Sequence, residues 1–464
     1  MIPTMDELNN RIQHIELVEQ LVDFVVDIDF EKLPDQAIQS AKIFLMDTIA
    51  VGIAGTTYDA TDKALSAAQS WSETGSIRVV GRPKVKLSRT SAAFVNGVQT
   101  HALEWDGLHE PSVVIALCAP VSALMAEIDS QQVSGKDLIV ALIVAVEVAV
   151  FFGGNSTSSP RFFRPSAAGV MGATMAMARL RNFDREQTKN ALGLAYSQVS
   201  GTMQAHWEGS MALPMQIGVA ARTAHMSVDM VAAGMTGPVD IIGGRFGYFQ
   251  LFESGGDIQG MLDNLGKPMK ITEMAHKPYP AGRATQATLT MIRRIQSEHS
   301  MRIDDIEHIH LYMPQLVLLL VGRPPTPEMT PSYARLCLRF VAPLMLIDGD
   351  IDPRRYSAEA FADDAIADLG NRISLHHDGN PDNNALGPQR MEIVLRDGTV
   401  LKADCDQPLG SPGNPLSKAQ RENKVRYCFS LGLPDADPEQ LIAICQEIQD
   451  LDDCSVLLDC AAGK

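Results

Sequence analysis

Apolar residues recur at helical spacing through most of the first 270 positions of the chain. Leu17, Leu21, Phe24 and Val25 fall on one face of a helix, and a longer apolar run extends from Asp35 to Ile53. A glycine closely follows that run, and glycine is a typical C-terminal cap of a helix. This part of the chain is therefore predicted to be almost wholly helical.

Two further helices are predicted from the residues that begin them. Ser134 with Asp137, and Asp184 with Gln187, each place a cap residue three positions before a side chain that can bond back to it. The apolar segment 138–152 that follows the first cap is shorter than a membrane span and contains a carboxylate. We predict a buried helix there and no membrane partner.

One acidic residue interrupts the apolar run of the second predicted helix. Asp47 has apolar neighbours on both sides in the sequence. Buried polar groups in proteins are almost always hydrogen-bonded or paired. If Asp47 is buried, we therefore expect it to have a partner from elsewhere in the chain.

The pattern changes from helical to alternating at about residue 272. Residues 308–313 alternate between polar and apolar side chains, as in a strand. Residues 391–402 alternate around Asp397 and Gly398, which is a strong hairpin signal. After a Gly/Pro loop, Ser417 can cap a new helix.

These patterns predict a mainly α fold with a smaller α+β domain. We expect a large all-helical domain built from residues 1–272 and 405–464, and an α+β lid domain, residues 273–404, inserted into it. Neighbouring segments of the same secondary-structure type tend to pack into one core. The change from helical to alternating spacing of apolar residues is therefore taken as a domain boundary.

Composition and charge narrow the class of ligand. The chain has 464 residues, 45% hydrophobic and 20% charged, which excludes disordered and fibrous proteins. Acidic side chains outnumber basic ones by 56 to 39, giving a net charge of −17. Such a surface repels phosphate backbones, so no nucleic-acid partner is expected. An anionic ligand would need a locally positive pocket.

Neither a metal site nor a secreted protein is indicated. The seven cysteines have no metal-binding spacing and no even-numbered disulfide pattern. Asp6 and Glu7 come early, where a signal peptide would carry basic and then apolar residues. We expect a soluble, cytoplasmic protein without a bound metal.

Chemically capable side chains are concentrated first in residues 101–112. His109 has the right pKa range for a general acid or base, and nearby carboxylates, Glu104 and Asp106, can tune or orient it. The alternative is that one of these carboxylates caps a helix and that His101 is an ordinary core histidine.

A second concentration lies in residues 276–283, at the expected domain boundary. Lys277 and Arg283 flank Tyr279, which stands between two prolines. Cations beside a rigid turn can bind a carboxylate or stabilise an enolate. The alternative is a surface hinge whose charges are solvated.

A third group is formed by Gln204 and His206, with Arg164 before a proline. An arginine at the start of a helix can bind an anion. It is as often an exposed positioning residue, and both interpretations stay open.

In this order, the motifs resemble the MmgE/PrpD family over nearly the whole chain. The segments that carry the resemblance include Phe44–Thr48, His101–Asp106, Gly234–Pro238, Lys277–Pro280 and Ser411–Ser417. The family contains dehydratases, decarboxylases and an epimerase of iminodisuccinate. The resemblance implies a helical domain closed by a lid, a site in the cleft between them, a homodimer and no required cofactor.

The chain departs from the family pattern where lyases carry ionisable groups. Arg164, Gln216 and Gly282 stand where those relatives have a histidine. Leu213 stands where they have a lysine. In the aspartate-rich loop, Glu104 replaces the first aspartate. Dehydration needs both a base and an acid, whereas epimerisation needs only abstraction and return of a proton.

The resulting hypothesis is a cofactor-independent epimerase, an isomerase acting on a small amino-polycarboxylate such as iminodisuccinate. The residues given catalytic roles are His109, Lys277, Tyr279 and Asp106. Those given substrate-binding roles are Arg164, Arg283, Glu104 and Gln204. Two alternatives stay open: a hydro-lyase resembling 2-methylcitrate dehydratase that acts on a tricarboxylate, and a non-catalytic relative that binds polycarboxylates.

Overall fold

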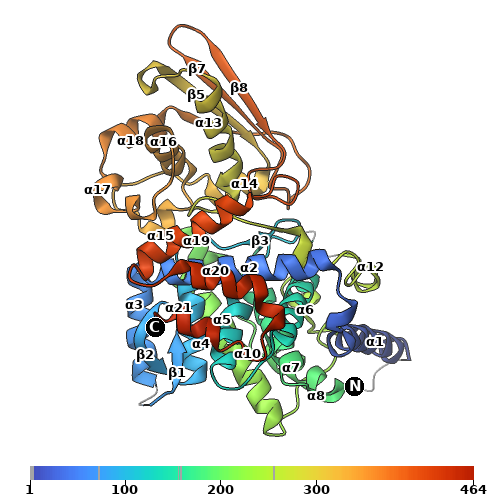
Figure 1. Cartoon of the computed structure of the whole chain (residues 1–464). Coiled ribbons are helices and arrows are strands. Elements are labelled where there is room, and N and C mark those ends of the chain that lie inside the picture. The colour runs from blue at the N-terminus through green and yellow to red at the C-terminus, as the bar shows by residue number, and fades with distance from the viewer. Residues whose placement is uncertain (1–4, 72–73, 155, 157–158, 254–255, 464) are drawn as a thin grey trace.

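The computed structural model describes residues 5–71, 74–154, 156, 159–253 and 256–463. Figure 1 shows two lobes, a large helical one and a smaller one that contains a sheet. Their buried hydrophobic residues form two clusters. The first cluster takes side chains from both ends of the chain, from Leu17 to Ala275 and from Val425 to Ala461, and the second runs from Tyr279 to Cys405.

The helical lobe is defined here as helices α1–α12 and α19–α21. Its first part contains α1 (Met5–Asp27), α2 (Asp35–Gly55), α3 (Asp59–Trp71), α4 (Arg89–His101), α5 (Cys118–Ile128), α6 (Gly135–Gly154), α7 (Arg164–Leu180), α8 (Arg185–Tyr196), α9 (Met203–Glu208), α10 (Ala212–Ala232), α11 (Tyr248–Leu251) and α12 (Ile258–Asp263). The C-terminal helices are α19 (Lys418–Gly432), α20 (Pro438–Glu447) and α21 (Val456–Ala461).

The caps predicted from the sequence begin the helices as expected. Asp184 and Gln187 form a reciprocal capping box at α8, and Ser417 and Gln420 form another at α19. At α6, the Asp137 amide donates to the Ser134 hydroxyl over 3.2 Å. These side chains satisfy amide groups that have no partner within the first turn of a helix.

Helices α2 and α6 form the centre of the helical lobe. By length and composition both are apolar enough to cross a membrane, with hydropathies of 1.4 and 2.3. In the fold, 83% and 89% of these segments are buried inside the protein, where α6 packs against α7. They are therefore buried core helices, and the cytoplasmic location stays a prediction.

The helical lobe is not all-helical, which corrects the sequence prediction. Strands β1 (Ile77–Val79) and β2 (Arg82–Leu87) form an antiparallel hairpin, with Gly81 at a positive φ of 69° in its turn. The short strands β3 (Leu108–His109) and β4 (Met274–Ala275) also pair. In β2, charged and apolar residues alternate as in a strand. The alternation covers only six residues, which is why it was not recognised between the longer helical segments.

The sheet lobe is defined here as strands β5–β8 and helices α13–α18. The sheet has the order β6-β5-β7-β8, from β5 (Ile306–Met313), β6 (Ile373–His377), β7 (Gln389–Leu395) and β8 (Val400–Cys405). The helices are α13 (Gln286–Glu298), α14 (Gln315–Val321), α15 (Pro331–Ala334), α16 (Leu338–Asp348), α17 (Ala358–Phe361) and α18 (Asp364–Asn371). The predicted hairpin is confirmed, because β7 and β8 pair antiparallel around Gly398.

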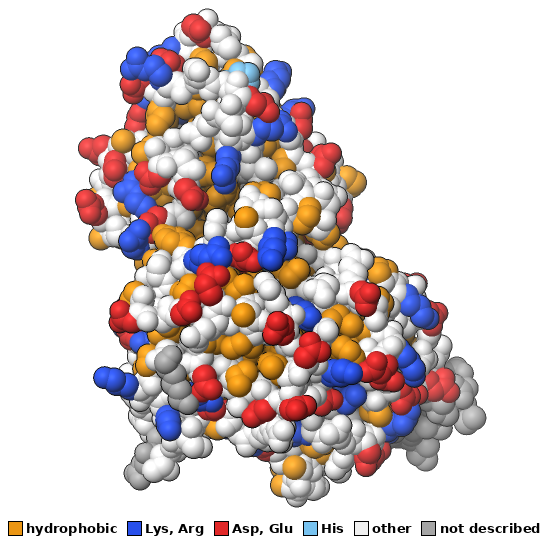
Figure 2. Space-filling view, in the orientation of Figure 1, with side chains coloured by type: hydrophobic (Ala, Val, Ile, Leu, Met, Phe, Trp, Pro, Cys, Tyr) orange, Lys and Arg blue, Asp and Glu red, His pale blue; other side chains and the backbone are white. Residues whose placement is uncertain are grey.

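The fold is thus mainly helical with a smaller sheet-containing part, while the exact domain boundaries, 1–272 with 405–464 and 273–404, stay a prediction. Figure 2 shows acidic and basic side chains spread over both lobes rather than gathered by sign. The chain as a whole has a net charge of −17, and the local charge at a pocket is set by the few residues that line it.

Asp47 is buried, and its partner comes from the C-terminal helix α19. Lys424 Nζ lies 2.8 Å from Asp47 Oδ1 and donates to the Trp105 carbonyl over 2.9 Å. Both side chains of the ion pair are 5% exposed or less. The pair therefore connects α2, α19 and the loop after α4, three segments that are distant in sequence.

We predict that Lys424→Met lowers the free energy of unfolding by about 3–5 kcal/mol, because it leaves the Asp47 carboxylate buried without its counter-charge. Urea denaturation measures the change. The matched control is Lys418→Met, which removes an exposed lysine 3.7 Å from Glu422 and should cost under about 1 kcal/mol. Equal stability of the two variants would contradict the prediction, and adding Asp47→Leu to Lys424→Met should restore part of the loss.

Candidate active site

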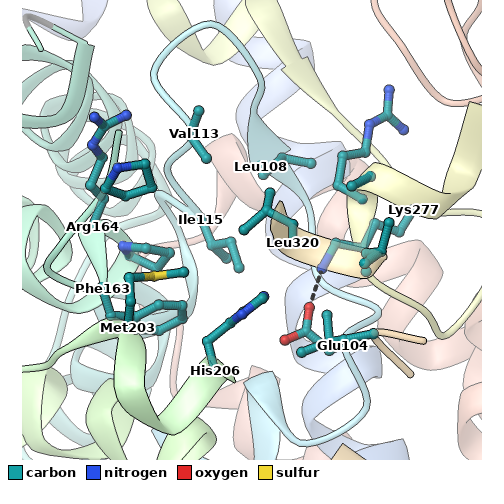
Figure 3. A pocket seen from close by; sticks show the side chains of 17 residues that line it. Glu104, Leu108, Val113, Ile115, Phe163, Arg164, Met203, His206, Lys277 and Leu320 are labelled. Carbon is teal, nitrogen blue, oxygen red and sulfur yellow. Dashed lines mark hydrogen bonds and ion pairs between the residues drawn. The ribbon is translucent and has the colours of Figure 1, made fainter. Parts of the chain in front are cut away.

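A pocket with about 600 Å³ of empty space, including space open to solvent, lies where the two lobes meet. Its polar and charged lining residues come from the helical lobe and from the connection between the lobes, and they are Glu104, Arg164, His206, Lys277 and Arg283. The sheet lobe contributes the apolar residues Leu320, Val321 and Leu336. The remaining lining is mostly apolar (Figure 3).

The Glu104–Lys277 ion pair lies on one wall of the pocket. Lys277 Nζ is 3.0 Å from Glu104 Oε2 and 3.3 Å from Asp106 Oδ1 (Figure 3). Lys277 follows β4, so the pairing of β3 with β4 brings its segment beside the loop after α4. Glu104 has a positive φ of 53°, an uncommon conformation for a residue other than glycine. Such strain persists where the surrounding contacts hold it, and here the ion pair does so.

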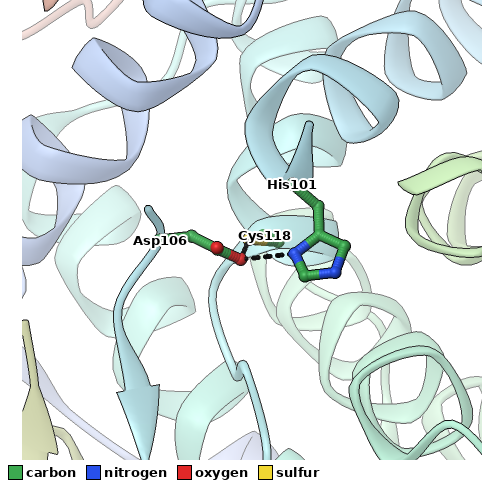
Figure 4. Close-up of side chains that lie close together, drawn as sticks. All are labelled: His101, Asp106 and Cys118. Atoms are coloured by element: carbon green, nitrogen blue, oxygen red, sulfur yellow. Dashed lines mark hydrogen bonds and ion pairs between the residues drawn. The ribbon is translucent and has the colours of Figure 1, made fainter. Parts of the chain in front are cut away.

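Asp106 lies behind this pair and is fully buried. Figure 4 shows it with His101 and Cys118: His101 Nδ1 lies 2.9 Å from Asp106 Oδ2, and the Cys118 thiol donates to the same oxygen over 2.7 Å. His101 Nε2 is 3.1 Å from Glu104 Oε1. Two carboxylates and two basic groups therefore form one compact network at the pocket wall.

The charges of this network stabilise one another. Burial alone would lower the pKa of His101, but the Glu104 and Asp106 carboxylates outweigh it and raise that pKa to about 10. Burial would raise the pKa of Glu104 and Asp106, and Lys277 with His101 holds both pKa values below their usual range. At neutral pH the histidine is therefore an imidazolium, both acids are carboxylates and the lysine is an ammonium.

Among the described residues, His101, Asp106 and Cys118 form a group whose ligand atoms lie within 4.8 Å of one another. A metal would need the cysteine as a thiolate and the histidine neutral. Burial and the charge of Asp106 raise the pKa of the Cys118 thiol, and His101 is protonated at neutral pH. The donor set therefore suits a hydrogen-bonded cluster better than a metal centre.

The two predicted arginines line the pocket, but each has a carboxylate partner. Arg164 donates to Glu253 through Nε and Nη2, over 2.7 and 3.2 Å, and to Asn384 through Nη1. Its guanidinium points away from the ring of His206 in Figure 3. Arg283 donates to Glu110 through Nε and Nη2, each over 2.9 Å. The positive charges of both arginines are therefore largely neutralised by Glu253 and Glu110.

Four predicted site residues do not line this pocket, and the first is the buried Asp106 behind the ion pair. His109 is outside because its neighbour Leu108 lines the pocket and side chains alternate along a strand. Its Nδ1 lies 2.8 Å from Ser112 Oγ, and its Nε2 lies 3.0 Å from Glu273 Oε2. The Tyr279 hydroxyl accepts from Arg293, and the ring belongs to the core of the sheet lobe.

Gln204 is the fourth predicted residue outside the pocket. It is exposed on α9 and bonds to Glu208, one turn further along the helix. Residues two apart in a helix point in opposite directions, which is why His206 is buried and lines the pocket while Gln204 does not.

The sequence hypothesis gave no role to two groups near the pocket, although His206 was among the candidate residues of its third group. Met203 and His206 have the i, i+3 spacing of one helix face, a signal that was present in the sequence. Arg335, 2% exposed, donates to the Ala102 carbonyl over 3.1 Å and stacks on two tyrosines. Nothing in the sequence near Arg335 pointed to the site, because its contact is made across 233 positions.

Comparison with known proteins identifies the family. Residues 19–261 match the MmgE/PrpD N-terminal domain and residues 279–450 match the MmgE/PrpD C-terminal domain. The chain belongs to the MmgE/PrpD family. The resemblance seen in the sequence is thereby confirmed at the level of the family, whereas a specific likeness to iminodisuccinate epimerase is not among the findings.

The chain is similar over nearly its whole length to cis-aconitate decarboxylases. It is 28% identical to the enzyme of Mus musculus over 461 residues, covering 95% of this chain and 92% of that one. Identity to the Homo sapiens enzyme is 27%, covering 93% and 91%, and to that of Aspergillus terreus 22%, covering 92% of both. These relatives are enzymes that act on a small tricarboxylate, so they favour a lyase over an isomerase.

The raised pKa of His101 predicts a pH-dependent stability. A group whose pKa is raised on folding stabilises the fold fully below its unfolded pKa, near 6.5, and the stabilisation is lost as pH rises toward about 10. We therefore expect the loss of unfolding free energy in His101→Gln to be largest at pH 6.5 and to shrink by pH 9.5, as measured by urea denaturation.

The control for this measurement is His225→Gln. His225 is fully buried, and burial lowers its pKa to about 4, so it is neutral in both the folded and unfolded chain from pH 7.5 upward. Its effect on stability should stay constant between pH 7.5 and 9.5. A constant difference for His101→Gln over the same range would show that the buried imidazole is not protonated.

Proposed function

We propose that the protein is a lyase acting on a small tricarboxylate, and specifically a hydro-lyase. The observation that carries the proposal is the Glu104–Lys277 pair in a pocket bounded by Arg164 and Arg283. The ionised Glu104 is the base for the proton alpha to a carboxylate, and the Lys277 ammonium is the acid for the departing hydroxyl. Lys277 is protonated because Asp106 and Glu104 outweigh burial and raise its pKa.

This proposal replaces the epimerase as the leading hypothesis. The argument for epimerisation was that the chain lacks a second ionisable group at its site. The pocket lining includes both a carboxylate and an ammonium, from Glu104 and Lys277. An acid and a base are therefore both at hand, and the similarity to cis-aconitate decarboxylases also favours lyase chemistry.

Substrate carboxylates are proposed to face Arg283 and Lys277, with Arg335 adding positive potential from behind the loop. Among the described residues, Arg335 has no carboxylate within ion-pair distance, unlike Arg164 and Arg283. A protein of net charge −17 can attract an anion only through such local excess. A homodimer, as the family resemblance implies, is retained as part of the proposal.

The epimerase is kept as a second candidate because Gly282 lines the pocket at the position where decarboxylases carry a histidine. Chiral chromatography of iminodisuccinate isomers incubated with the protein in deuterated water tests it. Interconversion with deuterium at the stereocentre, without any unsaturated product, would favour this candidate over the hydro-lyase.

We predict that the wild-type protein converts 2-methylcitrate to an unsaturated tricarboxylate, followed by its ultraviolet absorbance. Lys277→Met should lower kcat by about 10²–10⁴-fold, because it removes the proton donor. Lys418→Met, which replaces an exposed lysine of the helical lobe, is the control and should keep full activity. Release of carbon dioxide from cis-aconitate is measured in parallel, and a purely decarboxylating enzyme would refute the hydro-lyase.

A further inference from the structure

His206 stands in the pocket opposite the Glu104–Lys277 pair and has no role in the proposal above. It comes from α9, is 7% exposed and lines the pocket with Met203. Figure 3 shows its ring pointing from the wall formed by α9 toward the Glu104 side of the cavity. An imidazole that is nearly buried and aimed into a pocket is worth explaining, because buried polar groups normally have a partner.

The other lobe supplies a partner for the back of this ring. Arg323, which follows α14, donates from Nη1 to the His206 carbonyl over 2.9 Å, and its Nη2 lies 3.2 Å from His206 Nδ1. The same guanidinium stacks on Tyr333, with its carbon 4.8 Å from the ring centre. One side chain of the sheet lobe thus fixes both the backbone and the ring of a residue in the helical lobe.

This contact determines which ring nitrogen carries the proton. A guanidinium has five N–H donors and no acceptor, and it stays charged in proteins. Nδ1 must therefore accept the hydrogen bond from Arg323 with its lone pair. The proton of a neutral imidazole is then on Nε2. Among the residues that the structure describes, none hydrogen-bonds Nε2.

The surroundings also keep the ring neutral. Burial lowers the pKa of His206 to about 3, and the charge of Arg323 acts in the same direction, while Glu104 opposes both. His206 therefore stays uncharged across the physiological range. It can offer a hydrogen bond without gaining or losing a proton.

We propose that His206, oriented by Arg323, is a neutral N–H donor that binds a substrate carboxylate oxygen and stabilises the charge that develops there as the neighbouring C–H bond breaks. The α proton goes to Glu104, and the electron pair of that bond spreads onto the carboxylate oxygen that Nε2–H contacts. The inference rests on the proposed lyase function and adds a residue to its site. Preorganised donors of this kind stabilise developing negative charge.

The arrangement also links the donor to contact between the lobes. Arg323 belongs to the sheet lobe and His206 to the helical lobe, so the ring is held in this tautomer only while the two lobes touch here. Movement of the sheet lobe away from α9 would release Nδ1 and allow the other tautomer, which presents a lone pair to the pocket.

The first test reads the tautomer directly and does not depend on turnover. Nitrogen-15 NMR of the full-length protein labelled at histidine, with His206→Gln used to assign the signal, should show a neutral Nε2–H ring from pH 5 to 9. Addition of tricarballylate, a saturated tricarboxylate that cannot be dehydrated, should shift the Nε2 resonance. A ring protonated at pH 6, an Nδ1–H tautomer or an unshifted resonance would overturn the inference.

The second test uses turnover. His206→Leu should lower kcat by about 10²–10³-fold with little change in KM, because the donor acts on developing charge. His206→Gln keeps an N–H donor and should retain activity within about tenfold. Arg323→Met should lower kcat because Nδ1 loses the donor that fixes the tautomer, and it should raise the pKa of His206 only in part, since burial, the larger cause of the lowered pKa, remains.

The two proposals fail in different ways. If wild-type protein turns over no tricarboxylate but tricarballylate shifts the Nε2 resonance, the lyase reaction is refuted and His206 is supported as a carboxylate-binding donor. If turnover is found and His206→Leu matches the wild type, the role of His206 is refuted and the lyase stands. Equal losses in the Leu and Gln variants would indicate a packing role and also refute it.

Discussion

The site depends on one buried ammonium group. Lys277 lies within 3.3 Å of both Glu104 and Asp106, and without it two carboxylates would face each other in a water-poor wall. Like charges so close cannot all remain ionised, so one acid would take up a proton. The charges of these two acids help to keep His101 protonated, and that of Asp106 helps to keep Cys118 a thiol. The same lysine connects the loop after α4 to the segment that enters the sheet lobe.

Positive charge at the pocket of this acidic protein depends on how each arginine is paired more than on how many arginines are present. Arg164 and Arg283 reach the pocket already paired with Glu253 and Glu110. Paired arginines keep fixed orientations, whereas Arg335 has aromatic faces around it and a single carbonyl partner. The pocket can thus favour an anion through a few incompletely neutralised groups, although the molecule as a whole repels it.

Local patterns in the sequence predicted local structure well. Caps at Asp184 and Ser417, the hairpin around Gly398 and the buried helix α6 depend on residues within a few positions of one another. The need of Asp47 for a partner could also be foreseen, but Lys424 as that partner could not, because the contact depends on how α2 and α19 pack.

The same distinction explains the candidate site. Lys277, Glu104, Arg164 and Arg283 were found by residue type and motif, and all line the pocket. The direction of a side chain is harder to foresee, since strand β3 is only two residues long and turns His109 away from Leu108. Arg323 and His206 are 117 positions apart, and only the contact between lobes brings them together.

The bond from Lys424 to the Trp105 carbonyl has a consequence for synthesis of the chain. Lys424 on α19 is 319 positions after Trp105 in the sequence. The loop that carries Glu104 and Asp106 therefore leaves the ribosome long before the lysine that bonds to it. Until α19 emerges, Asp47 faces the interior without its counter-charge. The helical lobe is therefore completed only after the whole sheet lobe has been made, and a chain that stops short of residue 424 lacks both contacts of Lys424.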